Sequence, residues 1–260
     1  MSARIALLSA FIGNPGKQGL KMTDNCKRSL EGNGVDLYLF DDSDMDLLKR
    51  NYQPLVQVTT MKDRFEWFNK WRYRQHRYPT ETDTYNRLVA KLPKMQFYRL
   101  LNREYDYYIW MDSKYTIQDG WLEWVSDLIG QHGNHDLIVC KHSERANVKE
   151  EFDYLKHYML EKSDNLCSKY VLLDLYHQVA AYLKDPAYND DRLYEAGFLL
   201  YSRNILVHKR FLDEWYAHNF YYSIQDQLSL PYLVQKHGID VFPLEMNVGR
   251  LPGVKYGYFD

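Results

Sequence analysis

The sequence is poor in cysteine, with only Cys26, Cys140 and Cys167 in 260 residues. Their number is odd, they lie far apart, and no CxxC or Cys/His metal spacing occurs among them. Disulfide frameworks and zinc sites usually rely on paired or closely spaced cysteines. We therefore expect three structural thiols in a reducing compartment.

Long hydrophobic runs are also missing. No apolar stretch approaches the roughly 18 residues that cross a bilayer, and residues 5–11 are more typical of a strand than of a signal peptide. The formal net charge is only -2, which argues against a surface that binds nucleic acid as a whole. These absences predict a cytoplasmic protein with no transmembrane segment.

Several catalytic signatures are absent as well. The chain contains no GxGxxG, GxxxxGK[ST], GxSxG or HExxH sequence. Dinucleotide oxidoreductases, P-loop phosphotransferases, α/β-hydrolases and zinc proteases of the HExxH type are therefore disfavoured. Tyrosine, in contrast, is abundant, with 24 residues in an aromatic fraction of 16%. Aromatic rings fill cores and also stack on sugars and bases, and composition leaves both uses open.

The chain shows no repeat, low-complexity tract or Gly/Ser linker, which predicts a single domain over residues 1–260. Strand-like segments alternate with helix-like segments. The predicted strands are 5–9, 35–40, 107–111, 137–140, 194–201 and 239–242, and the main predicted helices are 21–30, 121–131, 207–220 and 224–237. Pro93 is expected to split the helical stretch 85–103 and to start a second helix. The alternation predicts an α/β fold with a Rossmann-like, mostly parallel sheet, which binds ligands beyond the carboxyl ends of its strands.

The strongest local motif is Tyr107-Tyr108-Ile109-Trp110-Met111-Asp112-Ser113-Lys114. A hydrophobic strand here delivers a carboxylate, a small residue and a cation to the ligand-binding edge of the sheet. An ordinary strand that ends in a solvated turn would have the same pattern, so this segment alone does not decide between the two interpretations.

This strand end resembles the GT-A glycosyltransferase pattern, in which Asp-x-Asp holds a metal on the donor diphosphate. The chain is more closely similar to a plant and bacterial glycosyltransferase-like family, formerly a domain of unknown function, whose plant members act in mucilage and cell-wall biosynthesis. The matching segments are Trp110 to Lys114, Cys140-Lys141-His142 and Gln225-Asp226-Gln227-Leu228, within residues 87–242. The resemblance implies a GT-A-like domain in which residues 1–115 mainly bind a nucleotide sugar and residues 116–260 mainly face the acceptor.

Lys114 departs from the Asp-x-Asp pattern, because it stands where many GT-A enzymes have a second metal-binding carboxylate. Hard cations require several oxygen ligands, and Asp112 alone is a poor site. We expect Asp112 to hold Mn²⁺ or Mg²⁺ together with donor phosphate oxygens. Metal-independent catalysis, in which the Lys114 ammonium neutralises the diphosphate leaving group, stays open.

Further candidates follow from their places in the predicted elements. Arg87 and Lys91 are four residues apart and share a helix face, and Asp41 and Asp42 follow a predicted strand. The candidate donor-binding residues are Asp41, Asp42, Arg87, Lys91, Lys94, Asp112 and Gln227. A solvated basic face and a plain acidic loop are the alternative interpretations.

Glu195 opens a predicted strand, and Asp226 and Gln227 begin a predicted helix. With Lys114, the two carboxylates Glu195 and Asp226 are the candidate catalytic residues. One would accept the proton of the acceptor hydroxyl and the other would orient donor hydroxyls. In the alternative interpretation, Asp226 only caps its helix. Gly197 would allow a sugar to approach the backbone closely.

Residues 61–78 contain six Lys or Arg and two Asp or Glu, interleaved with aromatic side chains. Trp71, Arg72 and Arg74 are the candidate acceptor-binding residues there. The same mixture suits a nucleic-acid surface, a sugar groove, or a helix with one buried aromatic stripe.

The sequence therefore predicts a hexosyl- or pentosyltransferase that uses a nucleotide sugar, with a UDP-sugar as the first choice of donor. The resemblance implies a glycan acceptor in polysaccharide or glycoconjugate synthesis. Two alternatives stay open: transfer to a modified base in viral DNA, and an inactive glycan-binding domain.

Overall fold

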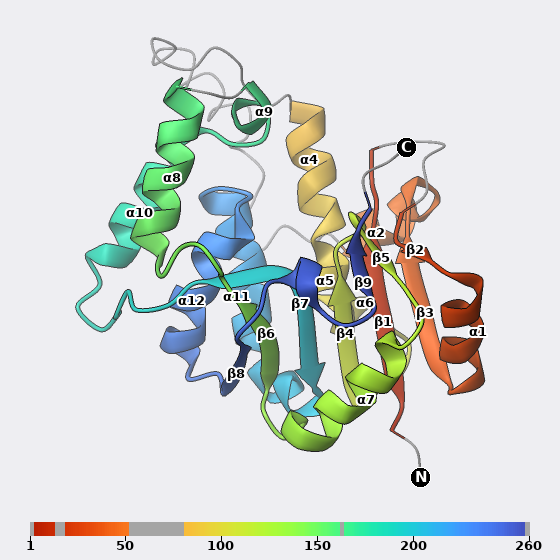
Figure 1. The fold of residues 1–260 in the computed structure, drawn as a ribbon. Helices are drawn as coiled ribbons and strands as arrows, with labels where there is room; N and C mark the ends of the chain where they lie inside the picture. The colour runs from red at the N-terminus through yellow and green to blue at the C-terminus, as the bar shows by residue number, and fades with distance from the viewer. Residues whose placement is uncertain (1–2, 14–18, 52–80, 162–163, 258–260) are drawn as a thin grey trace.

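The computed structural model describes residues 3–13, 19–51, 81–161 and 164–257, and a six-stranded sheet lies at their centre (Figure 1). The strand order is β3 (Val35–Phe40), β1 (Ile5–Ala10), β4 (Tyr107–Met111), β7 (Tyr194–Ser202), β6 (Leu137–Lys141) and β8 (Val241–Leu244). Only β7 runs antiparallel to its neighbours, and the pairs β1–β3, β1–β4 and β6–β8 are parallel. The predicted mixed α/β fold with a mostly parallel sheet is confirmed.

Alternating side chains of the strands divide the core into two layers. Leu8, Tyr108 and Leu199 belong to one hydrophobic cluster, while Leu7 and Ile109 belong to a second cluster across the sheet. This division follows from the period of two in a strand, where successive side chains point to opposite faces. Because both faces are covered, the central strands are apolar at nearly every position.

Helices cover both faces. The first layer packs against α2 (Met45–Asn51), α4 (Glu81–Ala90), α5 (Leu92–Met95), α6 (Phe97–Leu100), α11 (Lys209–Tyr221) and α12 (Asp226–His237). The second packs against α1 (Asp24–Gly32) and α7 (Trp121–His132). A third cluster joins α8 (Val148–Glu161), α9 (Asp164–Cys167) and α10 (Leu172–Leu183) to α12. No helix within the described residues is both long enough and apolar enough to span a membrane.

A small second sheet was not predicted from the sequence. It consists of β2 (Lys21–Met22), β5 (Tyr115–Ile117) and β9 (Val254–Tyr256), and β5 directly follows the motif that ends β4. The strands are two or three residues long, too short for a period of two to stand out in the sequence. Three short 3-10 helices, η1 (Asp42–Asp44), η3 (Arg203–His208) and η4 (Val248–Arg250), complete the described structure.

The boundaries differ from the predictions where a side chain caps a helix. The helix predicted at 21–30 begins at Asp24, because the Thr23 hydroxyl accepts the N–H of Cys26 and residues 21–22 pair with β5. Pro93 lies in the first turn of α5, so the predicted break is confirmed.

The three cysteines are buried and form no disulfide.

Candidate functional site

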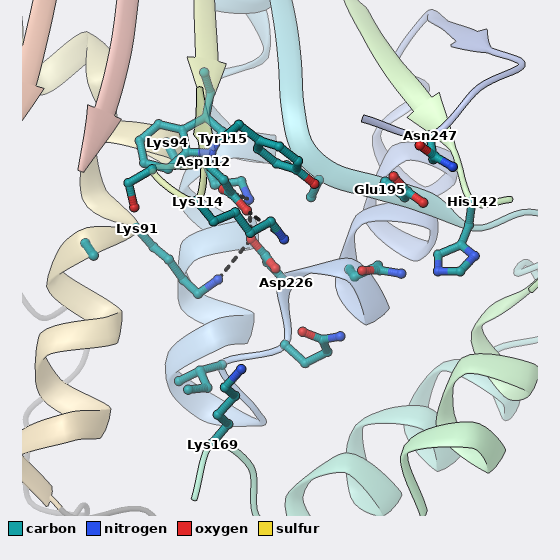
Figure 2. Close-up of a pocket in the computed structure, with 18 of the residues that line it drawn as sticks. Lys91, Lys94, Asp112, Lys114, Tyr115, His142, Lys169, Glu195, Asp226 and Asn247 are labelled. Atoms are coloured by element: carbon teal, nitrogen blue, oxygen red, sulfur yellow. Dashed lines mark hydrogen bonds and ion pairs between the residues drawn. The ribbon is translucent and has the colours of Figure 1, made fainter. Parts of the chain in front are cut away.

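A pocket of about 680 Å³ lies at the edge of the sheet where β1 and β4 end and β7 begins (Figure 2). Its walls come from α4, α5, the start of α12, the turn after β6, and residues 169–170. Ligands of open α/β sheets bind beyond the carboxyl ends of the parallel strands, and this pocket has that position. Six basic side chains line it: Arg87, Lys91, Lys94, Lys114, Arg145 and Lys169. Four acidic side chains line it as well: Asp112, Glu144, Glu195 and Asp226.

Asp112 lies at the base of the pocket because β4 ends one residue before it. Its N–H donates to the carbonyl of Gly197 over 2.8 Å, which continues the β4–β7 pairing and fixes the backbone. The indole N–H of Trp110 donates to Oδ1 over 2.8 Å. The Nζ atoms of Lys94 and Lys114 lie 3.9 and 3.6 Å from the carboxylate oxygens. Hydrogen-bond donors and ammonium groups therefore surround the Asp112 side chain.

Lys114 extends from the turn between β4 and β5 into the pocket. Its ammonium lies over the rings of Tyr115 and Tyr256, at 5.2 and 5.8 Å from the ring centres. Burial disfavours the charge, but the electrostatic contributions of Asp112 and of the neighbouring tyrosines together outweigh it and raise the pKa of Lys114 above its ordinary value. The side chain is 45% exposed and remains accessible to a ligand. Lys114 thus presents a permanent positive charge to the pocket.

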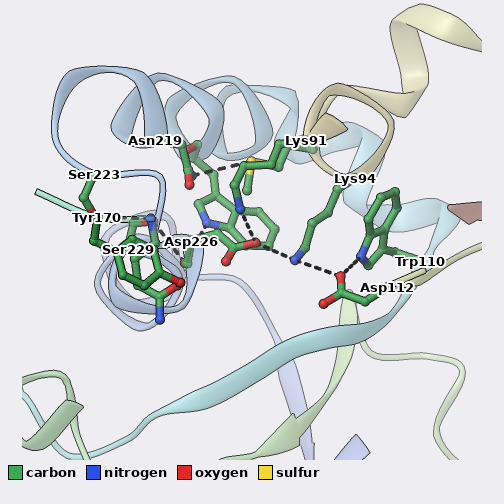
Figure 3. A network of polar contacts seen from close by, with 12 residues as sticks. Lys91, Lys94, Trp110, Asp112, Tyr170, Asn219, Ser223, Asp226 and Ser229 are labelled. Carbon is green, nitrogen blue, oxygen red and sulfur yellow. Dashed lines mark hydrogen bonds and ion pairs between the residues drawn. The ribbon is translucent and has the colours of Figure 1, made fainter. Parts of the chain in front are cut away.

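Asp226, Lys91 and Lys94 form an ionic group that we call the Asp226 triad (Figure 3). The Nζ atoms of Lys91 and Lys94 lie 2.9 and 2.5 Å from Oδ2 of Asp226. Lys91 precedes α5 and Lys94 lies three residues further on, so both lysines can face Asp226, the first residue of α12. Burial opposes ionisation of Asp226, but the two ammonium groups outweigh it and hold the pKa of this carboxyl well below its ordinary value.

Lys94 is the most buried member of the triad, with 4% of its side chain exposed. Its ammonium lies between the rings of Trp110 and Trp215, 5.7 and 5.9 Å from their centres. A charge this buried requires a carboxylate partner, and Asp226 supplies it. Figure 3 shows the line of contacts from Lys91 through Asp226 and Lys94 to Asp112 and Trp110.

Glu195 reaches the same edge because β7 runs antiparallel and begins where its neighbours end. Its Oε2 accepts the backbone N–H of Val248 over 2.9 Å. Burial raises the pKa of Glu195 above its ordinary value. Gly197, two residues on, leaves room for its neighbours: a Cβ there would lie 3.1 Å from the Tyr115 ring and 3.4 Å from Oδ2 of Asp112.

Arg87, Lys114 and Lys169 form what we call the cationic cluster. Arg87 comes from α4, and Lys169 comes from the turn between α9 and α10. Burial, together with the positive charges of Arg87 and Lys114, lowers the pKa of Lys169. Lys169 was not predicted from the sequence, because nothing in Cys167-Ser168-Lys169-Tyr170 distinguishes it from a solvated turn.

Other lining residues were also missed or only partly identified. Arg145 lies in the turn after β6, where its guanidinium contacts the buried carboxylate of Glu151 on α8. Burial and the Arg145 charge lower the pKa of His142 to about 4, so this histidine is neutral near pH 7. His142 belongs to a segment that carried the family resemblance, whereas Arg145 and Glu151 had no recognisable sequence signal.

Asp41 and Asp42 lie outside the pocket lining, although both follow β3 at the same edge of the sheet. The Asp41 side chain accepts the N–H of Ser43 and caps η1. Oδ1 of Asp42 accepts the N–H of Gly13 over 2.7 Å. Gln227, in contrast, lines the pocket beside Asp226. Trp71, Arg72 and Arg74 lie outside the described residues.

The acidic side chains do not form a cage for a divalent cation. The described residues contain no group of three or more His, Cys, Asp or Glu side chains that could hold a metal ion. Asp112 is approached by two ammonium groups and an indole N–H, and Asp226 is bound by two lysines. A hard cation at Asp112 would need oxygen ligands where these positive charges lie, so the residues present do not fit it.

Comparisons with known proteins agree with the family that the motifs suggested. The model of the TOD1/MUCI70 glycosyltransferase-like domain matches residues 38–248. No curated protein sequence matches the chain.

Three solved structures resemble the chain at low identity. Mouse xyloside xylosyltransferase 1 in its apo form has 8% identity and a TM-score of 0.44, with 97% of this chain and 84% of that chain covered. Core-mannan synthase A from Aspergillus fumigatus in an Mn/GDP form has 10% identity and a TM-score of 0.43, with coverage of 93% and 72%. The bifunctional glycosyltransferase WbbM in its apo form has 14% identity and a TM-score of 0.41, with coverage of 94% and 38%. Because the family model extends over most of the sequence, including the pocket strands β4, β5 and β7, this chain belongs to the TOD1/MUCI70 glycosyltransferase-like family.

Proposed function

We propose that the protein is a glycosyltransferase that moves a sugar from a nucleotide-sugar donor to an acceptor hydroxyl. The observation that carries the proposal is the pocket itself, in which accessible cations and carboxylates of contrasting basicity meet at the ligand-binding edge of the sheet. Transfer from a nucleotide sugar needs positive charge for a diphosphate and a carboxylate for the acceptor proton. Membership of a glycosyltransferase-like family supports the same reaction class.

The donor diphosphate is proposed to lie near Lys114, Asp112 and α4. As the bond from the anomeric carbon to the diphosphate oxygen breaks, negative charge grows on the leaving group. The Lys114 ammonium is accessible and keeps its proton, so it can stabilise that charge. A UDP-sugar is the first donor to test, as the family resemblance implies.

Glu195 is proposed to accept the acceptor proton. The acceptor oxygen forms a bond to the anomeric carbon, and its proton passes to the Glu195 carboxylate. A base with a raised pKa holds a proton better than one with a depressed pKa, which favours Glu195 over Asp226. Asp226 is proposed to keep Lys91 and Lys94 in place and to orient donor hydroxyls.

A glycan hydroxyl is the proposed acceptor, as the family resemblance implies. The alternative of a modified DNA base depended on residues 61–78, which lie outside the described residues.

The test is a thermal-shift screen with UDP-, GDP-, CMP- and dTDP-sugars, followed by an assay for release of the nucleotide from each donor that binds. We expect one nucleotide class to raise the melting temperature and to be released. Glu195→Gln should retain that shift but lose about 10²- to 10⁴-fold in turnover, the usual contribution of a general base. Absence of binding and release with every donor would contradict the proposal.

A further inference from the structure

The pocket contains positive charge of two kinds, and only one kind is neutralised by the protein. Lys91 and Lys94 both contact Asp226 within ion-pair distance. Arg87 and Lys169 have no carboxylate at such a distance among the described residues, and Lys114 shares Asp112 with Lys94. The cationic cluster therefore carries an excess of positive charge into the cavity.

Without a bound anion, this excess of positive charge raises the free energy of the folded protein. Like charges in a partly buried space raise one another's energy, and at Lys169 burial and the charges of Arg87 and Lys114 all lower the pKa. Figure 2 shows Lys114 and Lys169 directed into the same cavity from opposite sides. An anion between them would relieve the repulsion and gain charge-assisted hydrogen bonds.

Two of the four pocket carboxylates, Asp112 and Asp226, already lie beside ammonium groups. The indole of Trp110 donates to one oxygen of Asp112, and Lys94 and Lys114 lie within 4 Å of the two oxygens. Oδ2 of Asp226 contacts two lysines. A divalent ion bound at Asp112 would be repelled by ammonium groups already beside that carboxylate.

We propose that Arg87, Lys114 and Lys169 bind the donor diphosphate in place of a divalent metal ion. This inference rests on the proposed function and names the groups that neutralise the donor. Arg87 can form two parallel hydrogen bonds with one phosphate, while the two ammonium groups act as point charges on the other. The Asp226 triad stays paired within itself and supplies no charge to the ligand.

The test measures binding by calorimetry, with UDP, GDP and inorganic pyrophosphate as probes, in 1 mM EDTA and again in 1 mM Mn²⁺, concentrations on the order of those that remove or saturate typical sites. Pyrophosphate reports on the cationic cluster whatever base the donor carries. We expect binding in EDTA, with affinity changed less than threefold by Mn²⁺, and a weakening as salt rises.

Substitutions in the cationic cluster test whether this cluster binds the probes. Arg87→Gln and Lys169→Met should each weaken binding of these probes about 10- to 100-fold, the loss expected for one charged hydrogen bond. Lys169→Arg should retain most of the affinity, which separates loss of charge from loss of folding. Lys184→Met, at an exposed position outside the pocket, is the matched control and should bind as the unaltered protein does.

Two results would overturn the inference while the proposed function stands: binding of the nucleotides only with Mn²⁺, or unchanged affinity in both Arg87→Gln and Lys169→Met. Failure of all three probes and of every nucleotide sugar, with and without metal, would overturn the inference and the proposed function together.

Discussion

The Asp226 triad and the cationic cluster occupy the same pocket but differ in what balances their charge. The triad has its own carboxylate, and Lys94 within it is almost fully buried. The cationic cluster combines residues from three separate segments and leaves Lys114 nearly half exposed. A buried ion pair is destabilised when one partner is removed, whereas an accessible positive charge in excess of its carboxylates is available to a ligand. The number of lysines in a pocket therefore says less about anion binding than the positions of their partners.

The largest effect is expected for removal of the carboxylate from the triad. Asp226→Asn removes the carboxylate that both buried lysines contact and leaves Lys94 only the more distant Asp112, which should lower the free energy of unfolding by about 3–5 kcal/mol. Urea denaturation measures the loss.

A double variant provides the control for that loss. Lys94→Met combined with Asp226→Asn removes one of the stranded charges and should recover part of the stability, as in a double-mutant cycle. If Asp226→Asn is as stable as the unaltered protein but inactive, the triad is catalytic and the contrast with the cationic cluster is lost.

The next effect concerns turnover and not stability. Lys114→Ala should lower kcat about 10²-fold or more, roughly 3 kcal/mol, because charge on the leaving group grows in the transition state. Donor affinity should change less, and the urea midpoint should stay within error. Lys114→Arg, which keeps the charge, is the matched control. Turnover of Lys114→Ala at the normal rate would mean that this ammonium is only a solvated strand-end charge.

The stability contributions of the buried histidines and of the Asp226 triad should be lost in different pH ranges. Burial is the main cause that lowers the pKa of His142 and His218 from 6.5 to about 4. The unfolded chain therefore binds more protons between these values, and stability should fall by about 2 to 3 kcal/mol from His218, and by a smaller amount from the less buried His142, as pH drops from 6.5 to 4.

Asp226 should contribute nothing to that decrease, because its folded pKa is depressed and its stabilisation is lost only below the ordinary range of an Asp carboxyl. The destabilisation by Asp226→Asn should accordingly be equal at pH 7 and pH 5, whereas His218→Phe should flatten the pH dependence. A destabilisation that shrinks between pH 7 and pH 5 would show that Asp226 is protonated far more easily than the triad geometry implies.

The smallest effect is expected for Lys91. This lysine is the more exposed of the two that contact Asp226, and Lys94 remains when it is removed. Lys91→Met should cost about 1–2 kcal/mol in the free energy of unfolding and leave pyrophosphate affinity unchanged. A tenfold loss of pyrophosphate affinity would instead place Lys91 with the cationic cluster, as its helix spacing from Arg87 first suggested.

Local sequence predicted most of the elements and part of the site. The strand at 107–111, its terminal Asp112 and Lys114, and the break at Pro93 were all found, because hydrophobic strands and helix-breaking residues act within a few positions of the chain. The start of α12 near Asp226 was found for the same reason. The short strands β2, β5 and β9 were not, because they depend on partners up to about 140 residues away.

Local patterns in the sequence thus specify which residues stand at the ends of strands and helices. Which of these residues meet depends on tertiary packing. Glu195 opens β7, and it joins Asp112 at one edge only because β7 runs against its neighbours. The partnership of Lys94 with Asp226, 132 residues apart, and the arrival of Lys169 in the pocket likewise depend on how helices pack over the sheet. Strand direction and the pairing of charges at such separations depend on how the whole core is buried. A local pattern of residues does not contain that information.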